Sequence, residues 1–193
     1  MAETKNLTIL GIDPGLAAGG ISVVQWDETT KKFSSELCSS FTTSPKKILG
    51  HRLQKIRDYL EEAFELYRPA ACFCEKPSHG SASRPYSLGC FHGMLHFMCA
   101  EYEVPLWGFA PLQLKKFCFG KSLRGYSKDM IKDFLENLED FAVEAATLEK
   151  SDHNALDSLA AAYMGAVKMS GVTLPSRVRM ELLGDLKLYW NFS

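Results

Sequence analysis

The chain has 193 residues, of which 46% are hydrophobic and 23% are charged. This length suits one well-packed core and is too short for two comfortable domains. The formal net charge of −1 argues against a protein that coats nucleic acid with a globally basic surface, so any such surface must come from a local cluster of Lys and Arg.

The first part of the chain has the pattern of three antiparallel strands. Residues 7–12 form an apolar run that ends at Asp13, and residues 19–26 are typical of its hairpin partner after a turn rich in Gly and Pro. A third β-like run, which alternates less regularly, covers residues 32–41. We therefore expect Asp13 at the end of the first strand.

Helices and strands alternate in the middle of the chain. Ser44 and Pro45 give a helix-start signal, and apolar residues at helical spacing continue to about Tyr67. The apolar run 70–74 predicts a strand with Glu75 at its carboxyl end. A helix that is apolar on much of its circumference is expected over 87–103, and the next strand over 104–109.

The last part of the chain is mainly helical. A short helix is expected over 111–117, a loop over 119–125, a helix over 127–137, and a helix over 152–168 capped by Ser151. The order of all these elements predicts an α/β fold with a mixed five-stranded sheet, three antiparallel strands followed by two parallel ones, flanked by helices.

Two expectations concern organisation and environment. Residues 1–170 are expected to form one domain, and the apolar residues of 171–193 predict a tail packed on it. No run of 18 apolar residues occurs, so no membrane span is expected.

The cysteines lack zinc or redox spacing and are expected to be reduced. Reduced cysteines favour an intracellular site, the cytoplasm of a bacterium or of a virus-infected cell. The six are Cys38, Cys72, Cys74, Cys90, Cys99 and Cys118.

Three acids far apart in the sequence have the character of a metal site. Asp13 and Glu75 end two predicted strands, and Asp157 lies on the last predicted helix before a run of small apolar residues. Two divalent ions that act on a phosphodiester need several hard oxygen ligands held about 4 Å apart. The three acids can supply these ligands if the first and fourth strands are neighbours in the sheet.

At these positions the chain resembles the RuvC family of Holliday junction resolvases, within the ribonuclease H-like nuclease superfamily. Residues 11–16 (Gly-Ile-Asp-Pro-Gly-Leu) resemble the family's first motif, and residues 88–93 (Leu-Gly-Cys-Phe-His-Gly) resemble its central-helix motif. Residues 104–128 resemble its strand and basic loop, and residues 157–160 (Asp-Ser-Leu-Ala) complete the set in the family's order.

The resemblance implies a ribonuclease H-like nuclease domain over 1–170. It also implies a homodimer that binds branched DNA and resolves four-way junctions by paired nicks, with two Mg²⁺ or Mn²⁺ ions in each active site. Carried over by position, Asp13, Glu75 and Asp157 are expected to bind the metal, with Asp13 shared between the ions. Lys115 and Lys128 match basic residues that meet the scissile phosphate or the DNA backbone, and Lys128 is counted as catalytic.

The fourth metal ligand stays open between three neighbours. The family places an acid or His three residues before the last Asp, where this chain has Asn154. Helix geometry favours Asn154 or His153, and ligand chemistry favours His153 or Asp152. His153 is the preferred prediction. A second departure follows Glu75, where some family members carry an aromatic wedge and this chain has Lys-Pro-Ser-His, so the wedge residue stays open.

The middle of the chain also carries the local positive cluster that phosphate binding requires. Between Lys115 and Asp133 the cluster contains a single acid, Asp129. The alternative interpretation is that these basic residues form a solvated helix face. The nucleic-acid contacts are expected from Lys115, Lys116, Lys121, Arg124 and Lys128, with Lys132 beside them.

Three other functions are compatible with some of these sequence features. Another ribonuclease H-like nuclease, acting on flaps, branched DNA or RNA–DNA hybrids, would use the same acids. The Gly-Ile-Asp-Pro-Gly segment also resembles the phosphate loop of actin-like ATPases, but a second such loop and the length for a second lobe are missing. A DNA-binding module without catalysis is disfavoured because nearly all the required acids are present.

Overall fold

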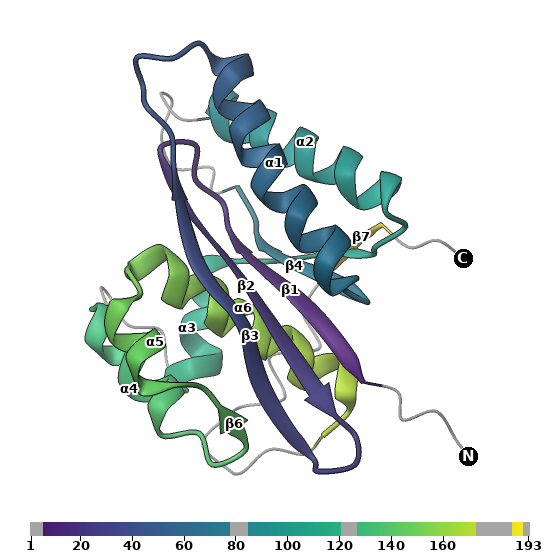
Figure 1. Cartoon of the computed structure of the whole chain (residues 1–193), viewed down its shortest axis with the longest axis vertical. Helices are drawn as coiled ribbons and strands as arrows, with labels where there is room; N and C mark the ends of the chain where they lie inside the picture. The colour runs from purple at the N-terminus through teal and green to yellow at the C-terminus, as the bar shows by residue number, and fades with distance from the viewer. Residues whose placement is uncertain (1–5, 78–84, 121–126, 173–186, 191–193) are drawn as a thin grey trace.

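The computed structural model describes residues 6–77, 85–120, 127–172 and 187–190, arranged around one seven-stranded sheet in the order β6-β3-β2-β1-β4-β5-β7 (Figure 1). The strands are β1 (Leu7–Asp13), β2 (Ala18–Asp27), β3 (Lys32–Thr42), β4 (Ala71–Glu75), β5 (Leu106–Phe109), β6 (Phe141–Ala142) and β7 (Lys187–Trp190). The helices are α1 (Leu49–Tyr67), α2 (Pro85–Glu101), α3 (Pro111–Phe119), α4 (Lys128–Glu136), α5 (Ala145–Lys150) and α6 (His153–Ser170).

The centre of the sheet decides where the acidic side chains lie. β1 pairs with β2 as an antiparallel hairpin and with β4 in parallel, with Ile12 aligned to Cys74. Asp13 and Glu75 each follow this aligned pair as the last residue of their strand. The two acids therefore stand side by side at the carboxyl end of neighbouring parallel strands, which is the adjacency that the sequence analysis had to assume.

Helices cover both faces of the sheet (Figure 1). α1 and α2 pack on one face around a core that includes Ile56, Leu60 and Phe91. The other face is covered by α3, α4, α5 and α6, whose buried side chains surround Tyr163. No helix of the described residues is both long and apolar enough to cross a membrane.

α6 lies unusually close to the two central strands because glycines face it. A Cβ built on Gly11 would stand 2.2 Å from the carbonyl oxygen of Ser158, and one on Gly20 would stand 1.9 Å from that of Asn154. Each distance is far shorter than real Cβ contacts, so any side chain at these positions would push the helix away. The glycines thus set the distance between α6 and the end of β1.

The sheet has two more strands than the five predicted, both at its edges. β6 is only two residues long and pairs in parallel with β3, so it left no recognisable pattern in the sequence. β7 comes from residues 187–190 and pairs antiparallel with β5. The division of the chain at residue 170 remains a prediction. α1 also begins later than the Ser44-Pro45 signal indicated, at Leu49.

Candidate active site

Three elements bring three acidic side chains together at the carboxyl end of the central strands. Asp13 is the last residue of β1, Glu75 is the last residue of β4, and Asp157 lies in the second turn of α6. The side chain of Asp157 is only 13% exposed. All three lie near enough to one another to interact electrostatically, so the predicted convergence of these sequence-distant acids is present in the fold.

The pKa values of the acids record this crowding. Burial, followed by the charges of Asp157, Glu75 and Asp152, raises the pKa of Asp13 to about 8. Burial and Asp157 raise the pKa of Glu75 to about 7, while Lys115 opposes this increase. Desolvation and like charges both disfavour the ionised forms. The pocket therefore concentrates carboxylates that gain stability when a cation is bound.

The first turn of α6 presents the three candidates for a fourth ligand. Asp152 is the N-cap residue, and its Oδ1 accepts a hydrogen bond of 2.9 Å from the amide of Ala155. His153 Nε2 lies 3.3 Å from Asp157 Oδ2 one turn further along the helix. Asn154 has its backbone carbonyl against Gly20. Asp152 is close enough to raise the pKa of Asp13, and His153 directly contacts an acid of the pocket.

A buried polar network anchors the acid-bearing end of α6 to the sheet. Ser22 Oγ on β2 lies 2.7 Å from Ser158 Oγ and donates to the carbonyl of Ala155 at 3.2 Å. Cys38 Sγ on β3 lies 3.2 Å from Ser151 Oγ. Because buried polar groups are costly unless paired, these contacts fix the register of α6 against β2 and β3. No sequence pattern predicted this network, although Ser22 and Ser158 interrupt otherwise apolar runs.

The oxygen donors of the pocket fit hard divalent cations such as Mg²⁺ and Mn²⁺. Three carboxylates converge there, and burial followed by their mutual repulsion raises the pKa of Asp13 and of Glu75. Within the described part of the chain, no three Asp, Glu, His or Cys side chains already stand close enough to hold one ion. The acidic side chains would therefore have to move closer together to hold an ion.

The structure describes only some of the predicted basic residues. Lys115 lies on α3 near enough to Glu75 to counter the rise in its pKa, and Lys116 follows it, half-buried, on the same helix. Lys128 is the first residue of α4, whose N-cap is Ser127 as expected. Lys121 and Arg124 lie outside the described residues, and so does the side chain of Lys128. The structure therefore brings one predicted lysine, Lys115, to the acids.

Comparison with known proteins gives one consistent result. The family model described as "Crossover junction endodeoxyribonuclease RuvC" matches residues 9–162. Proteins of that name from Thermotoga maritima and Treponema denticola are 27% and 30% identical to this chain, over 165 and 122 residues. The first match covers 84% of this chain and 92% of the relative, and the second covers 62% and 67%.

Solved structures show the same fold. The structure described as "T. thermophilus RuvC in complex with Holliday junction substrate" superposes with a TM-score of 0.70 at 22% identity, covering 86% of this chain and 96% of that one. The yeast mitochondrial Holliday junction resolvase superposes with a TM-score of 0.58 at 17% identity, covering 80% and 75%. At these identities the likeness concerns the fold.

Proposed function

The chain belongs to the RuvC family of crossover junction endodeoxyribonucleases, and from this premise we propose that it resolves four-way DNA junctions by paired, metal-dependent nicks. The observation that carries the proposal is the convergence of Asp13, Glu75 and Asp157 at one end of the sheet. The bacterial relatives support action on the DNA of a bacterial cytoplasm.

Asp13, Glu75 and Asp157 are the residues that would hold two Mg²⁺ or Mn²⁺ ions. Ions bound there supply activation of a water and stabilisation of the leaving oxygen in phosphodiester hydrolysis. His153 is proposed to complete the site, because it already contacts Asp157 at 3.3 Å. Asp152 is the alternative, but its carboxylate also caps α6.

The lysines of the same end of the sheet are proposed to meet the DNA. Lys115 lies beside Glu75 and is positioned to offset negative charge on the scissile phosphate. Lys116, Lys121, Arg124 and Lys128 are proposed to extend this contact along the DNA backbone. Burial of the acids keeps the pocket poorly solvated, and this strengthens each electrostatic interaction with the phosphate.

A cleavage assay on a panel of substrates tests the proposal. We expect Mg²⁺-dependent cleavage of a four-way junction at symmetric positions, and much slower cleavage of a flap, an RNA–DNA hybrid and a plain duplex. The measurement is the single-turnover rate on each end-labelled substrate at the same enzyme concentration. Equal rates on the flap or on the hybrid would show that the chain is a different ribonuclease H-like nuclease.

We also propose that the protein acts as a homodimer, and that the outer face of α2 is the contact. Tyr86 and Phe97 on this helix are 77% and 66% exposed. Gly89 and Gly93 lie between them at helical spacing, and a Cβ at either position would meet nothing within 4 Å. Exposed apolar side chains beside open glycines allow close contact with a second helix. A two-fold interface would present paired active sites to a two-fold substrate.

The dimer proposal predicts that Phe97→Asp produces monomers. Each interface would lose two buried phenylalanine side chains, which together contribute at least about 3 kcal/mol and so weaken dimerisation roughly 100-fold. Light scattering across a concentration series measures this change. Leu66→Asp is the matched control, because Leu66 is 67% exposed on α1, away from α2's outer face. A wild-type protein that is monomeric throughout the series would contradict the proposal.

A further inference from the structure

The charges of α1 and of the loop before it are separated along the chain. Residues 46–57 contain five Lys and Arg and no Asp or Glu, whereas residues 58–67 contain four acids and no Lys or Arg. The basic residues are Lys46, Lys47, Arg52, Lys55 and Arg57. The acidic residues are Asp58, Glu61, Glu62 and Glu65. The segment therefore has a positive half followed by a negative half.

This order of charges does not stabilise the helix. The N-terminal end of a helix favours acidic side chains and the C-terminal end favours basic ones, each by about 0.3–1 kcal/mol. The first turn of α1 has no acid and contains Arg52, and the last turn has no Lys or Arg and contains Glu65. Both ends thus oppose the helix dipole, so stabilisation of α1 does not account for the charge order.

The positive half is tied to the loop that follows Asp13. Thr43 donates its backbone amide to the carbonyl of Ala17 at 2.8 Å and its hydroxyl to the carbonyl of Leu16. Arg52 Nε donates to Thr43 Oγ1 at 2.8 Å, and Lys55 Nζ donates to the carbonyl of Thr42 at 3.1 Å. The start of α1 and the β1–β2 turn accordingly lie at the same end of the molecule (Figure 1).

The exposed lysines of this half are not neutralised by other described side chains. Lys46, Lys47 and Lys55 are exposed, and no ion pair joins them to an acid in the described ranges. Arg57, at the boundary, is paired with Glu61 at 2.8 Å. We call Lys46, Lys47 and Lys55 the α1 basic surface. Its charge is available to an anionic partner.

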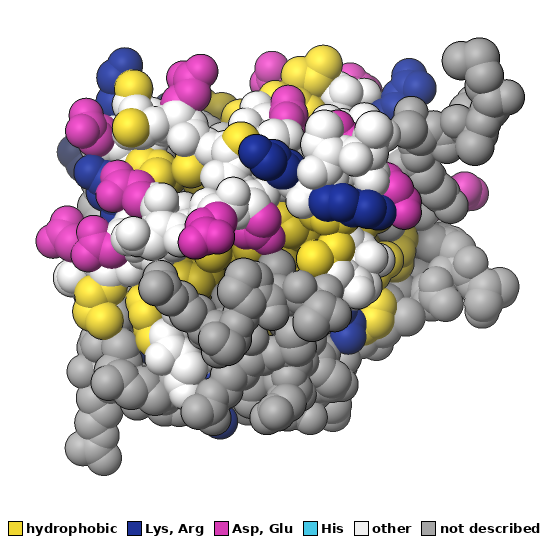
Figure 2. Space-filling model, turned by 90° about the horizontal axis from the view of Figure 1, so that it is seen from below, with side chains coloured by type: hydrophobic (Ala, Val, Ile, Leu, Met, Phe, Trp, Pro, Cys, Tyr) yellow, Lys and Arg dark blue, Asp and Glu magenta, His cyan; other side chains and the backbone are white. Residues whose placement is uncertain are grey.

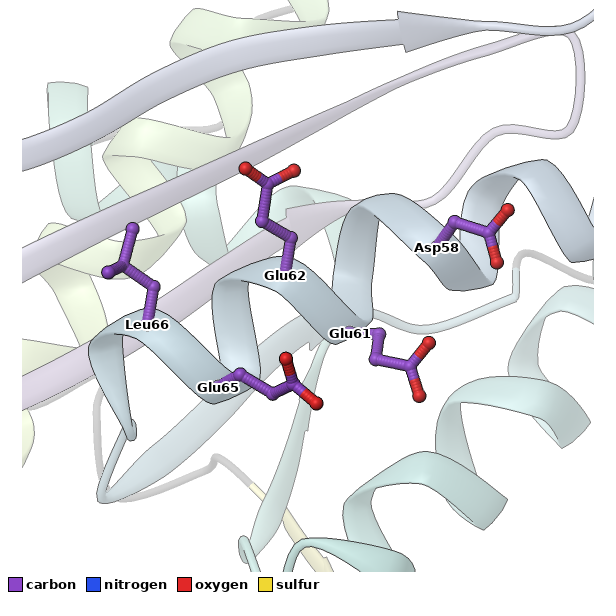
Figure 3. Close-up of a pocket in the computed structure, with 5 residues that line it drawn as sticks. All are labelled: Asp58, Glu61, Glu62, Glu65 and Leu66. Atoms are coloured by element: carbon purple, nitrogen blue, oxygen red, sulfur yellow. The ribbon is translucent and has the colours of Figure 1, made fainter.

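The negative half of α1, residues 58–67, lies further from the β1–β2 turn than the positive half. Its four acids and Leu66 line a shallow hollow of about 530 Å³, and their carboxylates spread outward from one helix (Figure 3). The opposite end of the molecule, seen from below in Figure 2, shows acidic and basic side chains interspersed over its described surface. A polyanion would therefore be attracted to the start of α1 and repelled by the rest of the helix.

We infer that the α1 basic surface binds the backbone of a duplex arm of the junction as the arm leaves the active site. The inference rests on the proposed function and adds a second contact to it. Lys115 lies near Glu75 on the α3 side of the sheet. The α1 basic surface lies on the other side, where α1 packs on the sheet and Lys55 donates to the carbonyl of Thr42. Regularly spaced phosphates of a duplex arm match clustered lysines. Arg52 on α1 donates to Thr43, at the start of the loop that carries Lys46 and Lys47.

Salt-dependent binding of a four-way junction tests this inference in the full-length protein. The variant Lys46→Gln with Lys47→Gln removes two positive charges from the surface. The variant Lys31→Gln with Lys32→Gln is the matched control, because it removes an adjacent lysine pair at the turn between β2 and β3. Metal-free binding is measured over a series of salt concentrations, and the Tm of each variant is recorded.

We expect the first variant to bind the junction roughly 3- to 10-fold more weakly than wild type, with a slope of log K against log salt that is smaller by up to about 1.8. The control should bind like wild type, because its lysines lie at the β2–β3 turn and outside the α1 basic surface, although its net charge equals that of the first variant. Equal slopes and affinities for the two variants would overturn the inference. A wild-type protein that does not prefer the junction over plain duplex would instead count against the proposed function.

Discussion

Asp13→Asn is expected to abolish junction cleavage while junction binding survives. The carboxylate of Asp13 interacts electrostatically with both Glu75 and Asp157. Loss of a residue that merely supports a metal ligand typically costs 10–100-fold, so loss of Asp13 as a proposed ligand should lower the single-turnover rate by more than about 100-fold. Binding is proposed to depend on the lysines and should therefore change little. Loss of binding together with cleavage would contradict this assignment.

The same variant should stabilise the metal-free protein in a pH-dependent way. Folding raises the pKa of Asp13 from 3.8 to about 8, so the folded state binds the proton more tightly than the unfolded state. The metal-free wild type therefore loses stability as the pH rises through this range. Asn cannot ionise and avoids the loss. We expect the Tm of Asp13→Asn to exceed that of wild type at pH 8, and the two values to converge near pH 4.

A metal titration separates the two effects of Asp13. Mg²⁺ should raise the Tm of wild type at pH 8, because the cation stabilises the ionised carboxylates, and should raise that of Asp13→Asn much less. The measurement is thermal unfolding with and without Mg²⁺ at matched ionic strength. An equal Mg²⁺ response in both proteins would mean that the ion binds elsewhere.

Gly20→Ala is expected to reduce both stability and cleavage, because it forces α6 away from the sheet. Its Cβ would stand 1.9 Å from the carbonyl oxygen of Asn154, which is backbone and cannot rotate away. Overpacking of this kind costs about 1–3 kcal/mol. Asn154 lies one turn before Asp157, so the displacement would also move this acid relative to Asp13. A misplacement of about 1 Å can cost roughly 100-fold in rate.

The measurements for Gly20→Ala are chemical unfolding and single-turnover cleavage at a temperature where the variant is folded. Gly50→Ala is the matched control, since a Cβ at Gly50 on α1 would meet nothing within 4 Å. In that helix Ala should stabilise the protein by about 0.5–1 kcal/mol without affecting cleavage. Wild-type cleavage by Gly20→Ala would show that the close approach of α6 does not position the acids.

Local patterns in the sequence were sufficient to predict the strands and the helix that carry the three acids. The apolar runs before Asp13 and Glu75 predicted buried strands, and both acids end their strands as expected. The edge strands were missed for a physical reason. β6 has two residues and β7 is a short strand in the tail, so pairing with neighbours rather than local propensity decides their conformation.

The sequence alone was sufficient to predict the fold class and to select the three acids. Both predictions depend on side-chain periodicity and on turn residues, which are patterns within a few consecutive positions. Only the tertiary structure decided that β1 and β4 are neighbours, that Gly11 and Gly20 admit α6, and that a serine pair anchors it. It also decided that Lys55 of α1 donates to the carbonyl of Thr42, whose neighbour Thr43 donates to the carbonyl of Leu16 in the loop after Asp13. These relations depend on contacts between residues far apart in the chain, such as Ser22 and Ser158, which are 136 positions apart, and no local pattern encodes them.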